Sequence, residues 1–311
     1  MVQTVSVFGA DNASGFGPPS APLAQLVEQR TFNPQVLGSS PRGRTDRLTL
    51  GGGPAMGDKV QTTRSGDVVT VTLCNPEKRN ALSMDVLVSL TDVLREIGDG
   101  DARGVILAAE GPVFSAGHNF GDMVGISRDA GLELLTVCSN LMQTMHSIPQ
   151  PIIARVHALA TAAGCQLVAT CDLAVAARSA SFAIPGGKGG LFCHTPLVAV
   201  ARSLTPKRAL EMAMTGDAIS AETAREWGFI NAVVDDADLD SAVTELLARA
   251  TRGSRVSKGL GKKAYYAQID MSEDDAYTFA SAVMADAVIS PEAQEGIASF
   301  LAKRPANFGG R

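Results

Sequence analysis

An alternation of short apolar runs with helical patterns, between residues 59 and 234, constrains the fold of this chain most strongly. Three apolar runs, at residues 104–109, 151–156 and 173–177, have the length and composition of buried strands. Helical patterns separate them. Strands joined by crossover helices pair in parallel, because the helix returns the chain to the starting end of the sheet. The alternation therefore predicts an α/β fold with a mostly parallel sheet.

A hairpin and a helix are expected before the first of these runs. Residues 60–64 and 68–73 read as two strands, and Ser65-Gly66-Asp67 between them reads as a turn. Ser83 is expected to cap a helix that Gly98 closes. The predicted buried face of this helix consists of Val86, Leu87, Leu90, Val93, Leu94 and Ile97.

The last third of the chain is predicted to be almost entirely helical. Thr195-Pro196 reads as a helix start with proline at its first position. Helical patterns continue to Phe300, with one short strand at residues 230–234. We therefore expect an α/β core over residues 56–254 and a helical region over residues 255–311.

Residues 1–55 differ in composition from the rest of the chain. They contain eight glycines and six prolines, and no apolar period lasts more than a few residues, so we predict a disordered extension. The stretch at residues 22–45 resembles the conceptual translation of a tRNA gene region, which would leave the extension untranslated and place the start at Met56. A targeting peptide is the alternative interpretation.

Charge and cysteine usage exclude several function classes. A net charge of −5 without a long basic run argues against a nucleic-acid partner. The longest uncharged stretch in the apolar middle, residues 156–171, is too short and too polar to suggest a membrane span. Five cysteines without a CxxC pair suggest neither zinc nor a disulfide framework. We expect a reducing compartment: the cytoplasm, or the mitochondrial matrix in a eukaryote.

Two glycine-containing turns are the first candidates for a catalytic site. Phe114-Ser-Ala-Gly-His118 follows a predicted strand, and Gly117 allows a sharp turn that leaves the amide of His118 free. Thr161-Ala-Ala-Gly-Cys165 opens a predicted helix, whose first N–H groups have no intrahelical partner. Two such donors can hold a developing oxyanion. The alternative is that both segments are simply structural turns.

Four segments, in this order, resemble the enoyl-CoA hydratase/isomerase (crotonase) superfamily. They are residues 75–82 (NPEKRNAL), 114–123 (FSAGHNFGDM), 160–172 (ATAAGCQLVATCD) and 295–304 (EGIASFLAKR). The resemblance covers residues 58–311 and implies a crotonase-like ββα spiral core with a helical C-terminal trimerisation region. It implies a homotrimer or hexamer that binds acyl-CoA thioesters, with no cofactor other than the CoA of the substrate. The amides of His118 and Ala163 would then stabilise the thioester enolate.

The chain departs from the family at its two catalytic glutamates. The positions that hold these residues in family hydratases carry Gln166 and Gly186 here. Neither residue can act as an acid or base near neutral pH, so we expect hydratase activity to be weak or absent. The remaining candidates for proton transfer are His118, Asp122 and His194. The thiol of Cys193 is a further candidate, because a helix N-terminus would lower its pKa.

Substrate-binding residues are also implied by the resemblance. Lys78, Arg79 and Ala81 correspond to positions that hold CoA, and Phe300 and Lys303 to positions that meet the nucleotide of a neighbouring subunit. The candidates for the acyl pocket are Phe120, Met123, Val124 and Leu132. A solvated turn and ordinary core contacts are the alternatives. Two functions stay open: an acyl-CoA enzyme (an isomerase, a lyase or a residual hydratase), and a non-catalytic acyl-CoA binding or regulatory protein.

Overall fold

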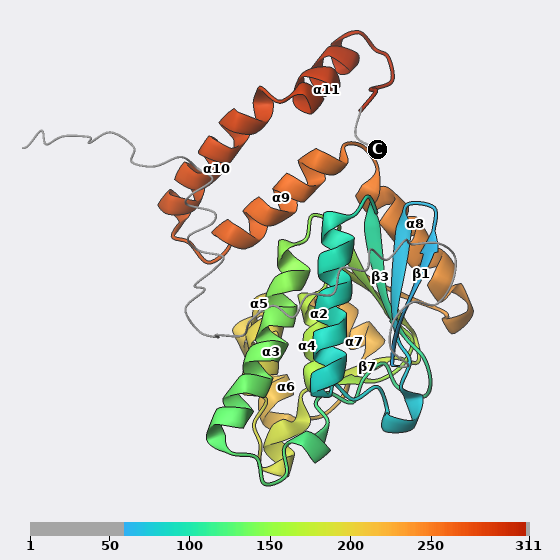
Figure 1. Cartoon of the computed structure of the whole chain (residues 1–311), viewed down its shortest axis with the longest axis vertical. Coiled ribbons are helices and arrows are strands. Elements are labelled where there is room, and N and C mark those ends of the chain that lie inside the picture. The colour runs from blue at the N-terminus through green and yellow to red at the C-terminus, as the bar shows by residue number, and fades with distance from the viewer. Residues whose placement is uncertain (1–58, 309–311) are drawn as a thin grey trace, which may run out of the picture. The chain divides into compact units, whose positions relative to one another are not determined.

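The computed structural model describes residues 59–308 (Figure 1). The predictions for residues 1–55, including the start at Met56, lie outside the described residues. The main sheet has six strands in the order β1-β2-β3-β4-β6-β9. Their bounds are β1 Val60–Ser65, β2 Val68–Leu73, β3 Gly104–Ala109, β4 Ile152–Val156, β6 Leu173–Ala177 and β9 Ala232–Val234. Only β1 pairs antiparallel, with β2, so the predicted hairpin and mostly parallel sheet are confirmed.

A second, small sheet was not expected from the sequence. It consists of β5 (Ala160–Thr161), β7 (Ser181–Ala183) and β8 (Ile219–Ser220), in the order β5-β7-β8. Strands of two or three residues are too short to show a period, so only their tertiary partners identify them. Because β5 takes up Thr161, the following helix begins at Ala163 and not at Thr161 as predicted.

Helices cover both faces of the main sheet. They are α2 (Met84–Asp99), α3 (Arg128–Ser147), α4 (Ala163–Thr170), α5 (His194–Ser203), α6 (Pro206–Thr215), α7 (Ala221–Trp227) and α8 (Leu239–Thr251). In β4, Ile152 packs into the core beneath α2 and α3, while its neighbour Ile153 packs against Val243 and Leu247 of α8 on the other face. Figure 1 shows α8 across the strands from α2 and α3. A strand buried on both faces has the continuous apolar sequence that predicted it.

Two helix boundaries test the sequence predictions in detail. All six residues predicted for the buried face of α2 are buried, and the helix runs one residue past Gly98 to Asp99. Helix α5 begins at His194, two residues before Pro196, so its predicted start is wrong. Proline fits there because residues of the first helical turn need no intrahelical N–H bond.

The C-terminal part consists of α9 (Arg255–Gln268), α10 (Glu273–Val288) and α11 (Pro291–Leu301). Helix α9 is joined to the core, since Arg255 donates to the carbonyl of Gly100 at 2.8 Å. Helices α10 and α11 pack on α9. Within residues 59–308, no helix combines the length and apolar character that crossing a bilayer requires. The division into core and helical region at residue 254 stays a prediction.

Candidate functional site

The two glycine turns predicted from the sequence lie next to each other. The amide of Phe114 donates to the carbonyl of Leu159 at 2.9 Å, and the amide of Thr161 donates to Ser115 at 2.9 Å. A bridge between Ser115 and Ala160 continues this pairing. The tertiary pairing therefore places the segment before His118 beside the segment before Ala163.

The amide of His118 faces the side on which Ala163 lies. On the opposite side, Leu82 donates to the carbonyl of Gly117 at 2.8 Å and accepts from the amide of Asn119 at 3.4 Å. His118 lies between these two bonded residues, and in this bridge pattern its own N–H points away from Leu82. A Cβ atom on Gly117 would lie 2.9 Å from the amide nitrogen of Ala163. Among residues 59–308, neither the His118 amide nor the Ala163 amide has a hydrogen-bond acceptor.

A strained backbone presents the Ala163 amide. The residue before it, Ala162, has φ 51° and ψ −120°, a conformation that residues with a Cβ atom rarely adopt. Its amide donates to the carbonyl of Ala183 at 2.9 Å, which holds the turn in place. At Gly164 a Cβ atom would lie 2.5 Å from the carbonyl oxygen of Ser115, so only glycine allows this approach. Close packing of two backbones thus fixes the turn.

A buried asparagine that the sequence analysis did not single out supports the first turn. Asn80 is 1% exposed, and its side-chain amide donates to the carbonyls of Glu110 and Val113 at 2.7 and 3.0 Å. The hydroxyl of Ser115 donates to the carbonyl of Asn80 at 2.8 Å. These partners lie 30 or more residues apart in the chain, so no local sequence pattern could reveal them.

The His118 ring and Asp122 differ in their environment. Both ring nitrogens of His118 are buried without a hydrogen-bond partner among residues 59–308. Burial lowers the pKa of His118. The backbone of Leu82 and, to a smaller extent, the carboxylate of Asp122 oppose this shift without reversing it. Asp122 is exposed in the short helix η2 (Phe120–Asp122) and accepts from the side chain of Asn119 at 2.8 Å. The imidazole is therefore neutral at pH 7.

Positions 166 and 186, at which family hydratases carry glutamate, differ in the space around their side chains. Gln166 is 4% exposed on α4, and its Oε1 has no hydrogen-bond partner within the described part of the chain. Gly186 lies in the short helix η3 (Pro185–Gly189), where a Cβ atom would lie 2.1 Å from the carbonyl oxygen of Leu191. No side chain fits at position 186 unless the backbone moves. A glutamate could therefore be restored at Gln166 more readily than at Gly186.

The structure corrects the expectation for Cys193 and places His194 apart from the turns. Cys193 is 7% exposed, and burial raises the pKa of its thiol, so the predicted lowering by the helix N-terminus is wrong. His194 is exposed, with its ring 5.1 Å from that of Phe192. A catalytic role for His194 stays a prediction.

The turn predicted to hold CoA is bonded to the first glycine turn. It follows the short helix η1 (Pro76–Lys78), and the carbonyl of Arg79 accepts from the amide of Ala116 at 2.9 Å. The side chains of Lys78 and Arg79 are exposed, whereas Ala81 is half-buried. Cations on this turn thus stand free to meet an anion next to the His118 turn.

The remaining candidates are mostly exposed apolar side chains. Phe120 is 71% exposed beside the half-buried Met123, and the candidates Val124 and Leu132 are exposed as well. Phe300 is 81% exposed on α11, and Lys303 follows that helix. Their roles in substrate binding stay predictions.

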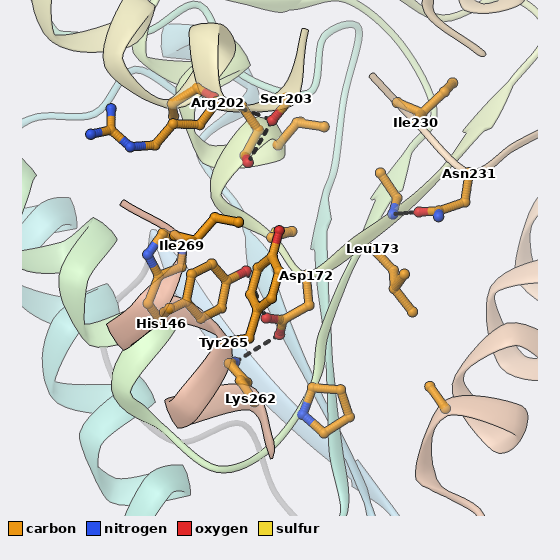
Figure 2. A pocket seen from close by; sticks show the side chains of 18 of the residues that line it. His146, Asp172, Leu173, Arg202, Ser203, Ile230, Asn231, Lys262, Tyr265 and Ile269 are labelled. Atoms are coloured by element: carbon orange, nitrogen blue, oxygen red, sulfur yellow. Dashed lines mark hydrogen bonds and ion pairs between the residues drawn. The ribbon is translucent and has the colours of Figure 1, made fainter. Parts of the chain in front are cut away.

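A separate cavity of about 830 Å³ lies between α9 and the core (Figure 2). No residue predicted for the acyl-CoA site lines it. In its wall, Asp172 accepts from Lys262 at 2.7 Å and from the hydroxyl of Tyr266 at 2.9 Å. The side chains of Lys262 and Asp172 are 8% and 16% exposed. This buried ion pair attaches α9 to the end of α4, and its partners are 90 residues apart, beyond the reach of any local pattern.

A histidine in this cavity should make stability depend on pH. The ring of His146 stacks on Tyr266 at 3.7 Å, and burial lowers its pKa to about 4, although the charge of Asp172 opposes the shift. Between the ordinary pKa of about 6.5 and 4, the unfolded chain binds one proton more than the folded chain. Unfolding in urea should therefore show stability falling by about 2–3 kcal/mol as pH drops through this window.

His146→Phe keeps a ring on Tyr266 and removes the titrating group. This variant should lose the part of the pH dependence that His146 supplies, while its stability at pH 7 changes little. An unchanged pH profile would contradict the assignment to His146.

The fold and the two turns define the crotonase class of proteins: strands β1 and β2 followed by repeated β-α units, a helical C-terminal part, and two free amides in adjacent turns. The profile of the enoyl-CoA hydratase/isomerase family matches residues 63–311, and the chain belongs to this family. Among residues 59–308, no group of three or more His, Cys, Asp or Glu side chains is placed to hold a metal ion.

Similar proteins support this assignment. The chain is 43% identical over 255 residues to the enoyl-CoA hydratase domain-containing protein 3, mitochondrial, of Rattus norvegicus, covering 81% of this chain and 85% of that protein. It is 30% identical to the 1,2-epoxyphenylacetyl-CoA isomerase of Escherichia coli, covering 78% and 95%. The crystal structure of the human enoyl-CoA hydratase domain-containing protein 3 superposes with a TM-score of 0.77 at 40% identity, covering 80% and 100%.

Proposed function

We propose that this protein binds acyl-CoA thioesters and stabilises their enolate with the amides of His118 and Ala163. The observation that carries the proposal is the pair of unpartnered amides in adjacent, rigidly held turns. Donors that are in place before charge develops need no reorganisation, and each is worth about 3 kcal/mol to an oxyanion. The strain at Ala162 is the cost of presenting one of these donors.

The CoA part of the ligand would lie along the turn at residues 78–81. Lys78 and Arg79 are exposed cations there, suited to the phosphates of CoA, and the turn is bonded to the His118 segment through Ala116. No other cofactor is proposed, because CoA arrives as part of the ligand.

The protein lacks the two carboxylates with which family hydratases add water to the acyl group, so hydration by that mechanism is not part of the proposal. Gln166 cannot take up a proton, and the backbone closes the space at Gly186. The neutral ring of His118 and the carboxylate of Asp122 are the groups that could still move a proton at the enolate. An isomerase or lyase that forms an enolate is therefore the first candidate. A non-catalytic acyl-CoA binder is the second, favoured by the loss of both carboxylates.

The C-terminal helices support an oligomer. Helix α10 buries none of its own side chains within residues 59–308. Large apolar side chains are exposed along α10 and α11, namely Tyr277, Met284, Ile289, Phe300 and Leu301. Exposed apolar area of this kind is typical of an interface. We propose a homotrimer or hexamer in which Phe300 and Lys303 reach the CoA of a neighbouring subunit, in the cytoplasm or in a mitochondrial matrix that keeps the five cysteines reduced.

Acetoacetyl-CoA tests the proposal directly, because its enolate absorbs in the near ultraviolet. Binding should increase the enolate fraction at fixed pH, since the two amides favour the anion over the neutral ester. Calorimetry on the same samples measures affinity, and light scattering measures the mass of the particle. Absence of any binding would overturn the proposed function, and binding without an increase in enolate would leave only the non-catalytic candidate.

A further inference from the structure

Ser115 contacts three segments of the candidate site: the turn predicted to hold CoA and both glycine turns. The residue is 0% exposed. Its hydroxyl donates to the carbonyl of Asn80 at 2.8 Å and accepts from the amide of Gly117 at 3.2 Å. Its carbonyl accepts from the amide of Thr161 at 2.9 Å. Because the hydroxyl is used both as donor and as acceptor, it is held in one orientation.

The bond between Gly117 and the Ser115 hydroxyl helps to fix the direction of the His118 amide. Gly117 is bonded on both sides, since its N–H donates to Ser115 and its carbonyl accepts from the amide of Leu82 at 2.8 Å. The C=O and N–H of a planar trans peptide point in opposite directions, so the bond to Leu82 aims the His118 amide away from Leu82. With both sides bonded, neither peptide unit next to Gly117 can rotate, although its φ of 84° lies where glycine moves easily.

The side chain of Ser115 also sets the spacing to the second amide. A Cβ atom on Gly164 would lie 2.7 Å from the Cβ of Ser115 and 2.9 Å from its hydroxyl oxygen. The backbone of α4 at Gly164 therefore lies directly against this side chain, one residue after Ala163. Close packing of this kind transmits a displacement of one side to the other. The same side chain thus bonds the first glycine turn and spaces the second.

Two residues with left-handed backbone angles provide the acceptors from the turn predicted to hold CoA. Arg79 and Asn80 have φ 52° and 50°, which is uncommon for residues with a Cβ atom. Their carbonyls accept from the amide of Ala116 at 2.9 Å and from the hydroxyl of Ser115 at 2.8 Å. Strained backbone of this kind persists where its surroundings hold it, and it is concentrated at functional sites. The CoA turn and the first glycine turn are thus one bonded unit, and a substitution can remove the Ser115 hydroxyl from it.

We propose that Ser115 is a positioning residue of the enolate site, whose hydroxyl holds the His118 amide at the direction and the distance from the Ala163 amide that an enolate oxygen requires. This inference rests on the proposed function and adds a residue that is itself buried away from the ligand. An enolate oxygen carries more negative charge than an ester carbonyl, so it gains more from two converging donors. The hydroxyl therefore raises the preference for the enolate and leaves the affinity for an unreactive ester unchanged.

Ser115→Ala tests the inference on the full chain with two ligands. Acetoacetyl-CoA reports the ratio of bound enolate to bound keto form by its near-ultraviolet absorbance at fixed pH. Butyryl-CoA, a saturated ester that stays in its ester form near neutral pH, reports binding by calorimetry. The variant keeps the Cβ atom that lies against Gly164 and removes the hydroxyl, so the enolate ratio should fall roughly tenfold. The affinity for butyryl-CoA should not change.

A conservative variant and a matched control complete the test. Ser115→Cys keeps a weak donor and a weak acceptor, so its enolate ratio should lie between those of wild type and Ser115→Ala. Thr91→Val removes another buried hydroxyl, which is 6% exposed and donates to the carbonyl of Leu87 within α2 at 2.8 Å. This control should bind both ligands as wild type does. Urea unfolding measures the stability of every variant.

The outcomes separate this inference from the proposed function. A wild-type enolate ratio in Ser115→Ala, or a ratio in Ser115→Cys no higher than in Ser115→Ala, would overturn the inference while the proposed function stands. An equal loss in Thr91→Val, or an equal loss of butyryl-CoA affinity in Ser115→Ala, would also overturn it, because the hydroxyl would then act through general stability. Absence of enolate enrichment by wild type would overturn both. If Ser115→Ala does not fold, the comparison of wild type with Ser115→Cys decides the matter.

Discussion

Gly117→Ala is expected to lower the affinity for the enolate of acetoacetyl-CoA by about 100-fold or more. A Cβ atom at this position would lie 2.8 Å from the Cβ of Ala162 and 2.9 Å from the amide nitrogen of Ala163. Real Cβ atoms do not approach so closely, so the two turns must separate. Loss of one oxyanion donor is worth about 3 kcal/mol, which corresponds to this change in affinity. The enolate absorbance described above measures it.

The backbone angle of Gly117, φ 84°, adds strain to any side chain, and the control must share that strain. Gly228 has φ 86°, and a Cβ atom there meets nothing within 4 Å. Gly228→Ala should therefore lose stability through strain alone and bind the enolate as wild type does. If both variants lose enolate binding equally, general destabilisation explains the effect, and the contact between the turns does not.

Asp172→Asn is expected to lower the free energy of unfolding by about 3–5 kcal/mol. The variant leaves the ammonium group of Lys262, 8% exposed, without its counter-ion, and removal of one partner from a buried pair has this cost. Burial already lowers the pKa of Lys262, against the attraction of Asp172, so the charge depends on this partner. Urea unfolding with circular dichroism measures the change.

An exposed ion pair in the same cavity provides the comparison. Arg202 and Asp270 lie 3.1 Å apart with side chains 53% and 67% exposed, so Asp270→Asn should leave stability nearly unchanged. The double variant Asp172→Asn, Lys262→Met should recover part of the loss, because it removes the unpaired charge. Equal effects of Asp172→Asn and Asp270→Asn would show that burial of the first pair contributes nothing.

Much of the fold follows from local patterns in the chain. The strands at residues 104–109 and 173–177 are recognisable because a strand buried on both faces must be continuously apolar. Helix α2 is recognisable because its six buried side chains recur at the helical period. The small sheet of β5, β7 and β8 was missed, since strands of two or three residues have no period to detect.

The helix start at Pro196 was misplaced for a related reason. Proline is tolerated throughout the first helical turn, so its presence marks the start of a helix only to within a few residues. For Cys193, the helix N-terminus was expected to lower the pKa of the thiol, but burial raises it. Burial is a property of the tertiary structure, so the local sequence did not predict this outcome.

The sequence by itself determined the order of strands and helices, the family, and the absence of the glutamate pair, because residue types and short periods are local properties. Only the tertiary structure decided that the amides of His118 and Ala163, which have no acceptor among residues 59–308, lie in adjacent turns, and that the backbone closes the space at Gly186. It also decided that the side-chain oxygen of Gln166 is buried without a partner among these residues. These features depend on contacts between segments far apart in the chain, such as Gly117 with Ala163. Close packing determines such distances, and no pattern along the chain records them.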